Sequence, residues 1–328
     1  MLNFSNNLDR AKNAIAFISP LLVIGVFLYC TNIFINSQLD SKDQFGHFFP
    51  WTNFFSIFSY YSFIIIYAVF VAAITRYLSV NIWISTIVLI LVFSLLTGNI
   101  IALASVIFFG YSSISLGRLI FSFFSLRIVS LLLVFLLGAG IIAFIVGVLA
   151  HFRVNYAMTY VTMLFLPILI SYHFKAKKLF LSDHPNNFFT KWKGSSRLNF
   201  FDITISTFIF LYFFVALLPE LGWDALWQHM FVASYVDSNK FWSFDVSKYV
   251  LSVVPMLGDW FFTIGYVLNG EVCSRLINFT FIPLICLLLK ELVFYIKNDI
   301  AAAKWTIIFF VLTPLTFTES STLFVELV

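Results

Sequence analysis

Acids, tryptophans and a histidine are concentrated between Pro219 and Arg275, in a chain that is otherwise strongly apolar. If a helix begins at Asp224, its side chain shares one face with Trp227 and Gln228, at i, i+3 and i+4. A carboxylate can accept a hydroxyl proton, an indole can stack on a sugar ring and an amide can hydrogen-bond to it. This spacing therefore suits a carbohydrate, with Trp223 as a second stacking side chain.

A simpler interpretation of the same residues stays open. Asp224 can cap the N-terminus of the helix, while the tryptophans sit at the membrane–water interface. The spacing alone favours neither interpretation. His229 is at i+5 from Asp224 and faces elsewhere on an ideal α-helix, so a structural or interfacial role fits it better. Glu220 is a capping or assisting residue in either case.

The composition indicates a polytopic membrane protein. Of the 328 residues, 61% are hydrophobic and 10% are charged, where a soluble domain has about 25% charged residues. The mean hydropathy is +0.99. The net charge of +4 is typical of cytoplasmic loops in such a protein and does not point to nucleic acid.

Several kinds of site are disfavoured by the residue pattern. The three cysteines have no CxxC spacing, which argues against a disulfide framework or a zinc site. The sequence has no GxSxG, HExxH, Walker or nucleotide-binding glycine motif. We therefore predict no metal ligands from the motifs.

We predict an all-α, polytopic transmembrane helix bundle with about nine apolar segments as candidate spans, where a full crossing takes roughly 20 residues. They are Asn13–Ile35, Phe54–Thr75, Asn81–Thr97, Ile100–Tyr111, Ile128–Ala150, Tyr156–His173, Ile203–Leu218, Val272–Ile296 and Trp305–Phe317. The third and fourth could form a tight hairpin about Gly98-Asn99. Leu251–Asn269 is also apolar but is interrupted by Pro255, Gly258, Asp259 and Gly265, so we expect it to lie at the surface or to enter and return.

Loop charge sets the expected orientation. The most basic loop, 175–197, is predicted to be cytoplasmic, with phosphate binding as the weaker alternative. The N-terminus is then cytoplasmic too, with a retained first helix in the cell (inner) membrane. We divide the chain into N-terminal transmembrane helices, 1–200, and a membrane module, 201–328. The module has an external loop, 219–271, with short juxtamembrane helices and a second external loop beginning near 318.

Several short motifs occur in order along this module. They are Pro219, then W-D-A-L-W-Q-H (223–229), P-M-L-G-D (255–259), R-L-I-N (275–278), and Thr313-Pro314 through Phe324-Val325-Glu326. In this order they resemble a bacterial multi-pass branch of the integral-membrane glycosyltransferases of the type-C fold, which use polyprenyl-phosphate-linked sugars. The specific resemblance covers about 219–328, and upstream it is only architectural.

The resemblance implies a role for each matching residue. Asp224 would be the catalytic general base on the acceptor hydroxyl, which is part of a glycan, lipid or protein. Glu326 would be the acid of the second external loop, where Asp is more usual. The expected substrate-binding residues are Trp223, Trp227, Gln228, His229, Asp259 and Arg275. Some members use a divalent metal near these acids, so the cofactor stays open.

Three alternatives to an active transferase also follow from the sequence. Type-C members usually continue through further helices after the second external loop, and this chain ends at Val328, so we expect a truncated or inactive version. A transporter or flippase subunit should carry charges mid-helix, and Lys290 and Glu291 are its main candidates. A non-catalytic membrane assembly protein is the third alternative.

Overall fold

The computed structural model describes residues 54–77, 80–125, 130–173, 199–223, 225–243, 247 and 256–323. All regular secondary structure in these ranges is helical. The chain forms two compact units, one of 1–87, 195–211 and 289–318 and the other of 88–194, 212–288 and 319–328. The predicted span Asn13–Ile35 and the basic loop 175–197 lie outside the described residues.

The helices are assigned to the units as follows. In the first unit lie α2 (Phe54–Tyr77), α11 (Ile300–Leu312) and most of α12 (Pro314–Ser321). In the second lie α4 (Ile100–Phe123), α5 (Leu131–Ala150), α6 (Ala157–His173), the π-helix η3 (Ala225–His229) and α9 (Met230–Asn239). Besides α12, three helices contribute residues to both units: α3 (Ile82–Leu96), α8 (Phe200–Ala216) and α10 (Leu257–Lys297).

Helix α8 organises the first unit through one face, at a spacing of four residues. Asp202 pairs with Lys304 of α11 at 2.8 Å. Ser206 hydrogen-bonds to Thr86 of α3 at 2.6 Å between the two hydroxyl oxygens. The Phe210 ring stacks on a ring of α2, with centroids 4.1 Å apart. Polar contacts of this kind hold apolar helices together where burial from water contributes little.

The described helices support fewer spans than the sequence predicts. Three of them, α4, α5 and α10, are long and apolar enough to cross a membrane, and up to five spans result if each bent helix pair counts as one. Helices α6 and α8 have only 17 residues each. The membrane character is therefore shown, while the count of about nine spans is not supported among the described residues.

Two predicted helix ends were wrong for local reasons. Helix α4 does not stop near Tyr111 but continues to Phe123. Its Ser113 and Ser115 hydroxyls donate to the carbonyls four residues earlier, at 2.8 Å each, so these polar residues do not interrupt the helix. The last predicted span, Trp305–Phe317, is broken at Pro314, where α11 and α12 meet at a 62° bend.

Helix α10 is two helices joined by a reversal. Asn269 and Gly270 have non-helical backbone angles, and Gly270 has a φ of 72°. The Ser274 hydroxyl donates to the Phe262 carbonyl at 2.7 Å, although twelve residues of straight helix span about 18 Å. A methyl group on Gly265 would lie 2.6 Å from the Ser274 backbone. The first part thus folds back on the second, with the boundary where the sequence predicted it, between Asn269 and Val272.

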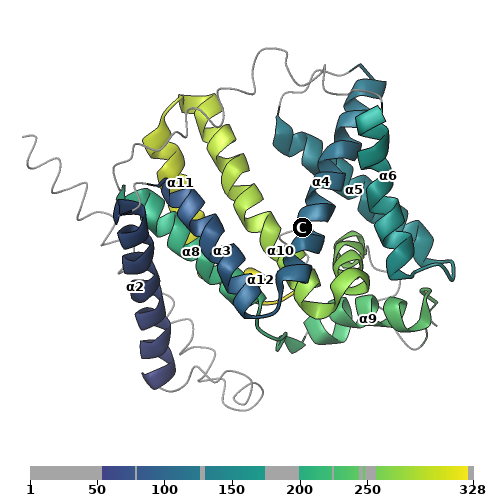
Figure 1. Ribbon diagram of the computed structural model, residues 1–328, viewed down its shortest axis with the longest axis horizontal. Helices are drawn as coiled ribbons and strands as arrows, with labels where there is room; N and C mark the ends of the chain where they lie inside the picture. Colours follow the sequence, from purple (N-terminus) through teal and green to yellow (C-terminus); the bar gives the residue numbers. More distant parts are fainter. Residues whose placement is uncertain are drawn as a thin grey trace, which may run out of the picture. The chain divides into compact units, whose positions relative to one another are not determined.

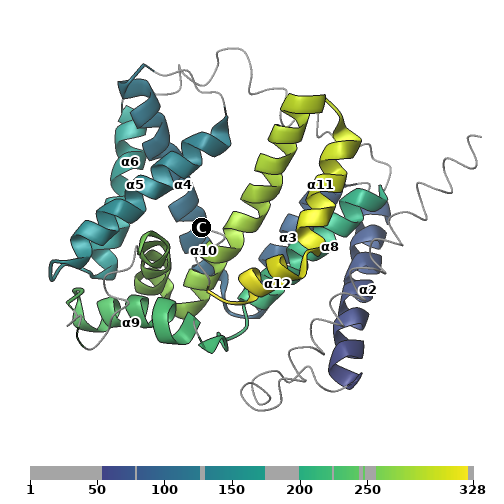
Figure 2. The ribbon, with the colours of Figure 1, turned by 180° about the vertical axis from the view of Figure 1, so that it is seen from behind.

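Helices α4, α5 and α6 lie side by side in the second unit (Figure 1 and Figure 2). The contact between α4 and α5 is made by glycines. A methyl group on Gly138 would lie 1.9 Å from the Ser113 carbonyl oxygen, and one on Gly117 would lie 1.9 Å from that of Val134. The two backbones touch, which is the close approach that small residues allow in membrane helices.

This contact predicts a contrast between two glycines of α5. Gly138→Ala is expected to lower the free energy of unfolding by about 1–3 kcal/mol, because the new methyl group must push two backbones apart. Gly140→Ala adds the same group where no atom lies within 4 Å, and should cost nothing. Denaturant titration in detergent micelles measures both, and equal stability of the two variants would contradict the packing described.

Candidate functional site

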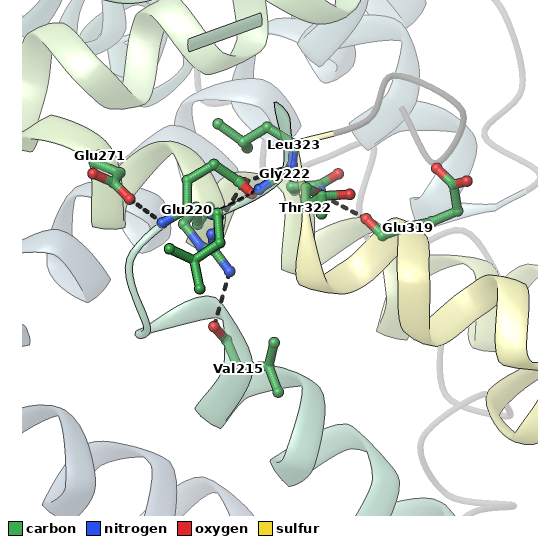
Figure 3. Close-up of polar contacts among 10 residues, drawn as sticks. Val215, Glu220, Gly222, Glu271, Glu319, Thr322 and Leu323 are labelled. Atoms are coloured by element: carbon green, nitrogen blue, oxygen red, sulfur yellow. Dashed lines mark hydrogen bonds and ion pairs between the residues drawn. The ribbon is translucent and has the colours of Figure 1, made fainter. Parts of the chain in front are cut away.

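The carboxylate of Glu220 lies at the centre of a buried polar cluster in the second unit (Figure 3). Oε1 accepts the backbone N–H groups of Leu221, at 3.0 Å, and Gly222, at 2.8 Å. Oε2 accepts the backbone N–H of Leu323 at 2.9 Å and lies 3.0 Å from Nη1 of Arg275. One side chain thereby binds its own segment, helix α10 and the turn after α12.

Arg275 compensates the charge of Glu220. The two side chains are 3% and 0% exposed, and Nη2 of Arg275 also donates to the Val215 carbonyl at 3.0 Å. Burial raises the pKa of Glu220 above its ordinary value, while the positive charge of Arg275 and the backbone N–H donors oppose that change. The cluster therefore keeps a carboxylate away from water without leaving it unpaired.

Two further side chains of α10 complete the cluster. Glu271 accepts the backbone N–H of Glu220. Nδ2 of Asn278 donates to the carbonyls of Glu319, at 3.0 Å, and Thr322, at 2.9 Å. We call Glu220, Glu271, Arg275 and Asn278 the Glu220 cluster. Its effect is to hold the segment after α8 and the turn at 322–323 against the same face of α10.

Gly222 shows how closely these two segments approach. A methyl group at this position would lie 2.9 Å from Cγ2 of Thr322 and 3.1 Å from Oε1 of Glu220. Any larger residue would push the Thr322 side chain or the Glu220 carboxylate aside. The absence of a side chain at 222 is therefore part of the contact.

The two tryptophans of the predicted site are paired. The rings of Trp223 and Trp227 are parallel to within 4°, with centroids 5.7 Å apart, and the residues are 60% and 58% exposed. Gln228 is half-buried beside them. Asp224 lies outside the described residues, although the chain is described on both sides of it. Glu326 also lies outside them, so the two catalytic assignments stay predictions.

His229 and Asp259 form a buried pair. Nδ1 of His229 lies 2.6 Å from Oδ1 of Asp259, and the two side chains are 5% and 1% exposed. The Phe262 ring meets the imidazole edge-on. The pair joins the end of η3 to the first turn of α10. Because both side chains are buried, the substrate-binding role predicted for them would be indirect, through the segments that they hold in place.

The helix type at this point differs from the prediction. Residues 225–229 form a π-helix, not the ideal α-helix on which the i, i+3 and i+4 spacing of Asp224, Trp227 and Gln228 was based. A π-turn closes hydrogen bonds between residues five apart and is often found at functional sites. His229, at the end of this π-helix, is buried against Asp259.

The His229 pair leads to a stability prediction. Asp259→Ala leaves the buried imidazole without this carboxylate and is expected to lower the free energy of unfolding by about 1–3 kcal/mol. Asp259→Asn keeps an acceptor oxygen and should lose less. Chemical denaturation of the two variants in micelles measures the difference, and wild-type stability for Asp259→Ala would show that the pair does not support the fold.

Sequence reasoning singled out Arg275 and named Glu220 as a capping or assisting residue, but it did not link the two. Glu271, Arg275 and Asn278 are spaced at i, i+4 and i+7, which places all three on one helical face. That polar stripe in an apolar helix is the signal that could have identified the cluster. No local signal links it to Leu323.

The described residues contain no group of three or more His, Cys, Asp or Glu side chains that could hold a metal ion. Comparison of the chain with family models, with curated proteins and with solved structures found no match.

Proposed function

We propose that this membrane protein transfers a sugar from a polyprenyl-phosphate carrier to a glycan, lipid or protein acceptor at the outer face of the cytoplasmic membrane. The observation that carries the proposal is the Glu220 cluster. Through it, the segment that leads to Asp224 and the turn that leads to Glu326 are bound to one another. These are the two acids that the type-C resemblance implies.

Chain connectivity makes this arrangement informative about the acids. Asp224 follows Gly222 by two residues and Glu326 follows Leu323 by three. A residue extends the chain by at most about 3.3–3.6 Å. The described residues just before each acid are thus in contact through Glu220, and this contact supports a proposal in which two acids act on one sugar.

In this proposal Asp224 removes the proton of the acceptor hydroxyl, and the hydroxyl oxygen bonds to the sugar carbon. The bond from that carbon to the polyprenyl phosphate breaks on the opposite side, so the carbon is inverted. The exposed indoles of Trp223 and Trp227 present apolar surface beside the base, and Gln228 adds an amide. His229, Asp259 and Arg275 are buried, so we assign them to holding the substrate-binding segments in place.

A transfer assay with the reconstituted protein tests the proposal. The protein is placed in phospholipid vesicles with a polyprenyl-phosphate-linked radiolabelled sugar and an acceptor, and both sugar transfer and movement of the donor across the bilayer are measured. Transfer is the expected result. Movement without transfer would instead support a transporter or flippase subunit, and the absence of both would support an assembly protein.

A further inference from the structure

The segment from Leu218 to Trp227 has an unusual distribution of polar and apolar groups. It begins two residues after α8 ends, and its backbone is not helical between Pro219 and Gly222. Five of its side chains are large, apolar and 40–60% exposed. These are Leu218, Leu221, Trp223, Leu226 and Trp227.

Four backbone donors of the same segment are satisfied inside the protein. The N–H groups of Glu220, Leu221 and Gly222 are donated to the carboxylates of Glu271 and Glu220, and the N–H of Leu226 is donated to the Gly222 carbonyl at 2.9 Å. Arg275, which is itself buried, compensates the charge of Glu220. The segment thus directs polar contacts inward while its leucines and tryptophans are exposed.

Two physical limits determine which medium contacts the exposed apolar side chains of this segment. Irregular backbone exposed to lipid is not found in the hydrocarbon core, where each backbone carbonyl as well as each N–H group needs a partner within the protein. Contiguous exposed leucines and tryptophans are unfavourable in water. The layer between these two media accepts both, and it is where tryptophan, with an apolar ring and one N–H donor, is enriched.

We propose that Leu218–Trp227 is an interfacial anchor, with its five apolar side chains inserted at the boundary between the lipid headgroups and the acyl chains. The partner is the phospholipid surface itself. The inference does not depend on the proposed enzymatic function, since it rests on exposure and backbone hydrogen bonding alone.

Spin-label accessibility in vesicles of phosphatidylcholine and phosphatidylglycerol tests the depth. The spin label is attached at Leu221→Cys or at Leu226→Cys, in the full chain with Cys30, Cys273 and Cys286 changed to Ser. Both variants keep the two indoles. Phe144→Cys on the apolar helix α5 and Asn239→Cys at the end of α9 are matched exposed references for lipid and water. The ratio of oxygen to nickel-chelate accessibility at 221 and 226 is expected to lie between those of the two references.

Three outcomes would overturn the proposal. A ratio at 221 and 226 equal to that at 239 would place the segment in water, and a ratio equal to that at 144 would place it in the lipid core. Low accessibility to both reagents would mean that another protein surface covers the segment. A second measurement avoids the cysteine substitutions. The fluorescence difference between the wild type and the Trp223→Phe, Trp227→Phe double variant should be quenched more by lipids brominated near the headgroup than by lipids brominated near the chain end. The opposite order would reject an interfacial position.

Discussion

Asp224→Asn is expected to reduce the rate of sugar transfer by about 10²–10⁴-fold, the contribution that a positioned general base makes to a reaction. The amide has nearly the same shape as the carboxylate but does not accept a proton at neutral pH. Binding of the carrier should change little, because the indoles of Trp223 and Trp227 remain. The initial rate at saturating polyprenyl-phosphate sugar in reconstituted vesicles measures the effect.

The chain provides a matched control for this change. Asp237 lies on α9 of the same unit and pairs with Lys240 at 2.8 Å, with both side chains partly exposed. Asp237→Asn makes the same chemical substitution in the same predicted external loop and should leave the rate at the wild-type value. Equal rates for the wild type and Asp224→Asn would remove position 224 from the mechanism, as would an equal loss in the two variants.

Arg275→Ala is expected to lower the free energy of unfolding by about 3–5 kcal/mol, because it leaves a buried carboxylate without its compensating charge. The Glu220 side chain has no exposed surface through which water could replace the guanidinium. The same substitution removes the hydrogen bond to the Val215 carbonyl. Denaturant titration in micelles, followed by circular dichroism, measures the loss.

An exposed ion pair calibrates that result. Lys240→Ala breaks the pair with Asp237, which is partly exposed, and exposed pairs contribute about 0–1 kcal/mol. A double variant, Glu220→Gln with Arg275→Met, removes both buried charges and should recover part of the stability lost in Arg275→Ala. If Arg275→Ala costs no more than Lys240→Ala, the Glu220 cluster does not hold the second unit together.

The helical, membrane-embedded character of the chain was predictable, because it follows from composition and from the length of apolar runs. The predicted ends failed where local chemistry opposed hydropathy. Serines that donate to carbonyls one turn earlier extended α4, and Pro314 broke a segment that hydropathy alone treats as continuous. The reversal at Asn269 and Gly270 fits the expectation that 251–269 enters and returns, although Gly258, Asp259 and Gly265 lie within the helix and do not interrupt it.

The candidate site was predictable only in part, for a different reason. Motif order identified Arg275, Asp259 and His229, but it did not show that two of them form a pair with one another and the third serves Glu220. The hydrogen bond from Leu323 to Glu220 joins residues 103 positions apart. No periodicity or spacing within a window of sequence encodes such a contact, and the π-helix at 225–229 likewise departs from the period that pattern reasoning assumes.

A single cross-link tests most directly whether Glu220 holds the two acid-bearing segments together. A Cβ atom at position 222 would lie 3.3 Å from Cβ of Thr322, close to the roughly 3.5–4.5 Å found in disulfides. In a chain whose native cysteines are changed to Ser, Gly222→Cys with Thr322→Cys is therefore expected to form a disulfide under mild oxidation in membranes. Protection from maleimide labelling reports the bond, and Arg275→Ala in the same chain should reduce it. Full labelling of both cysteines in the folded, oxidised protein, as in the two single-cysteine variants, would contradict the account.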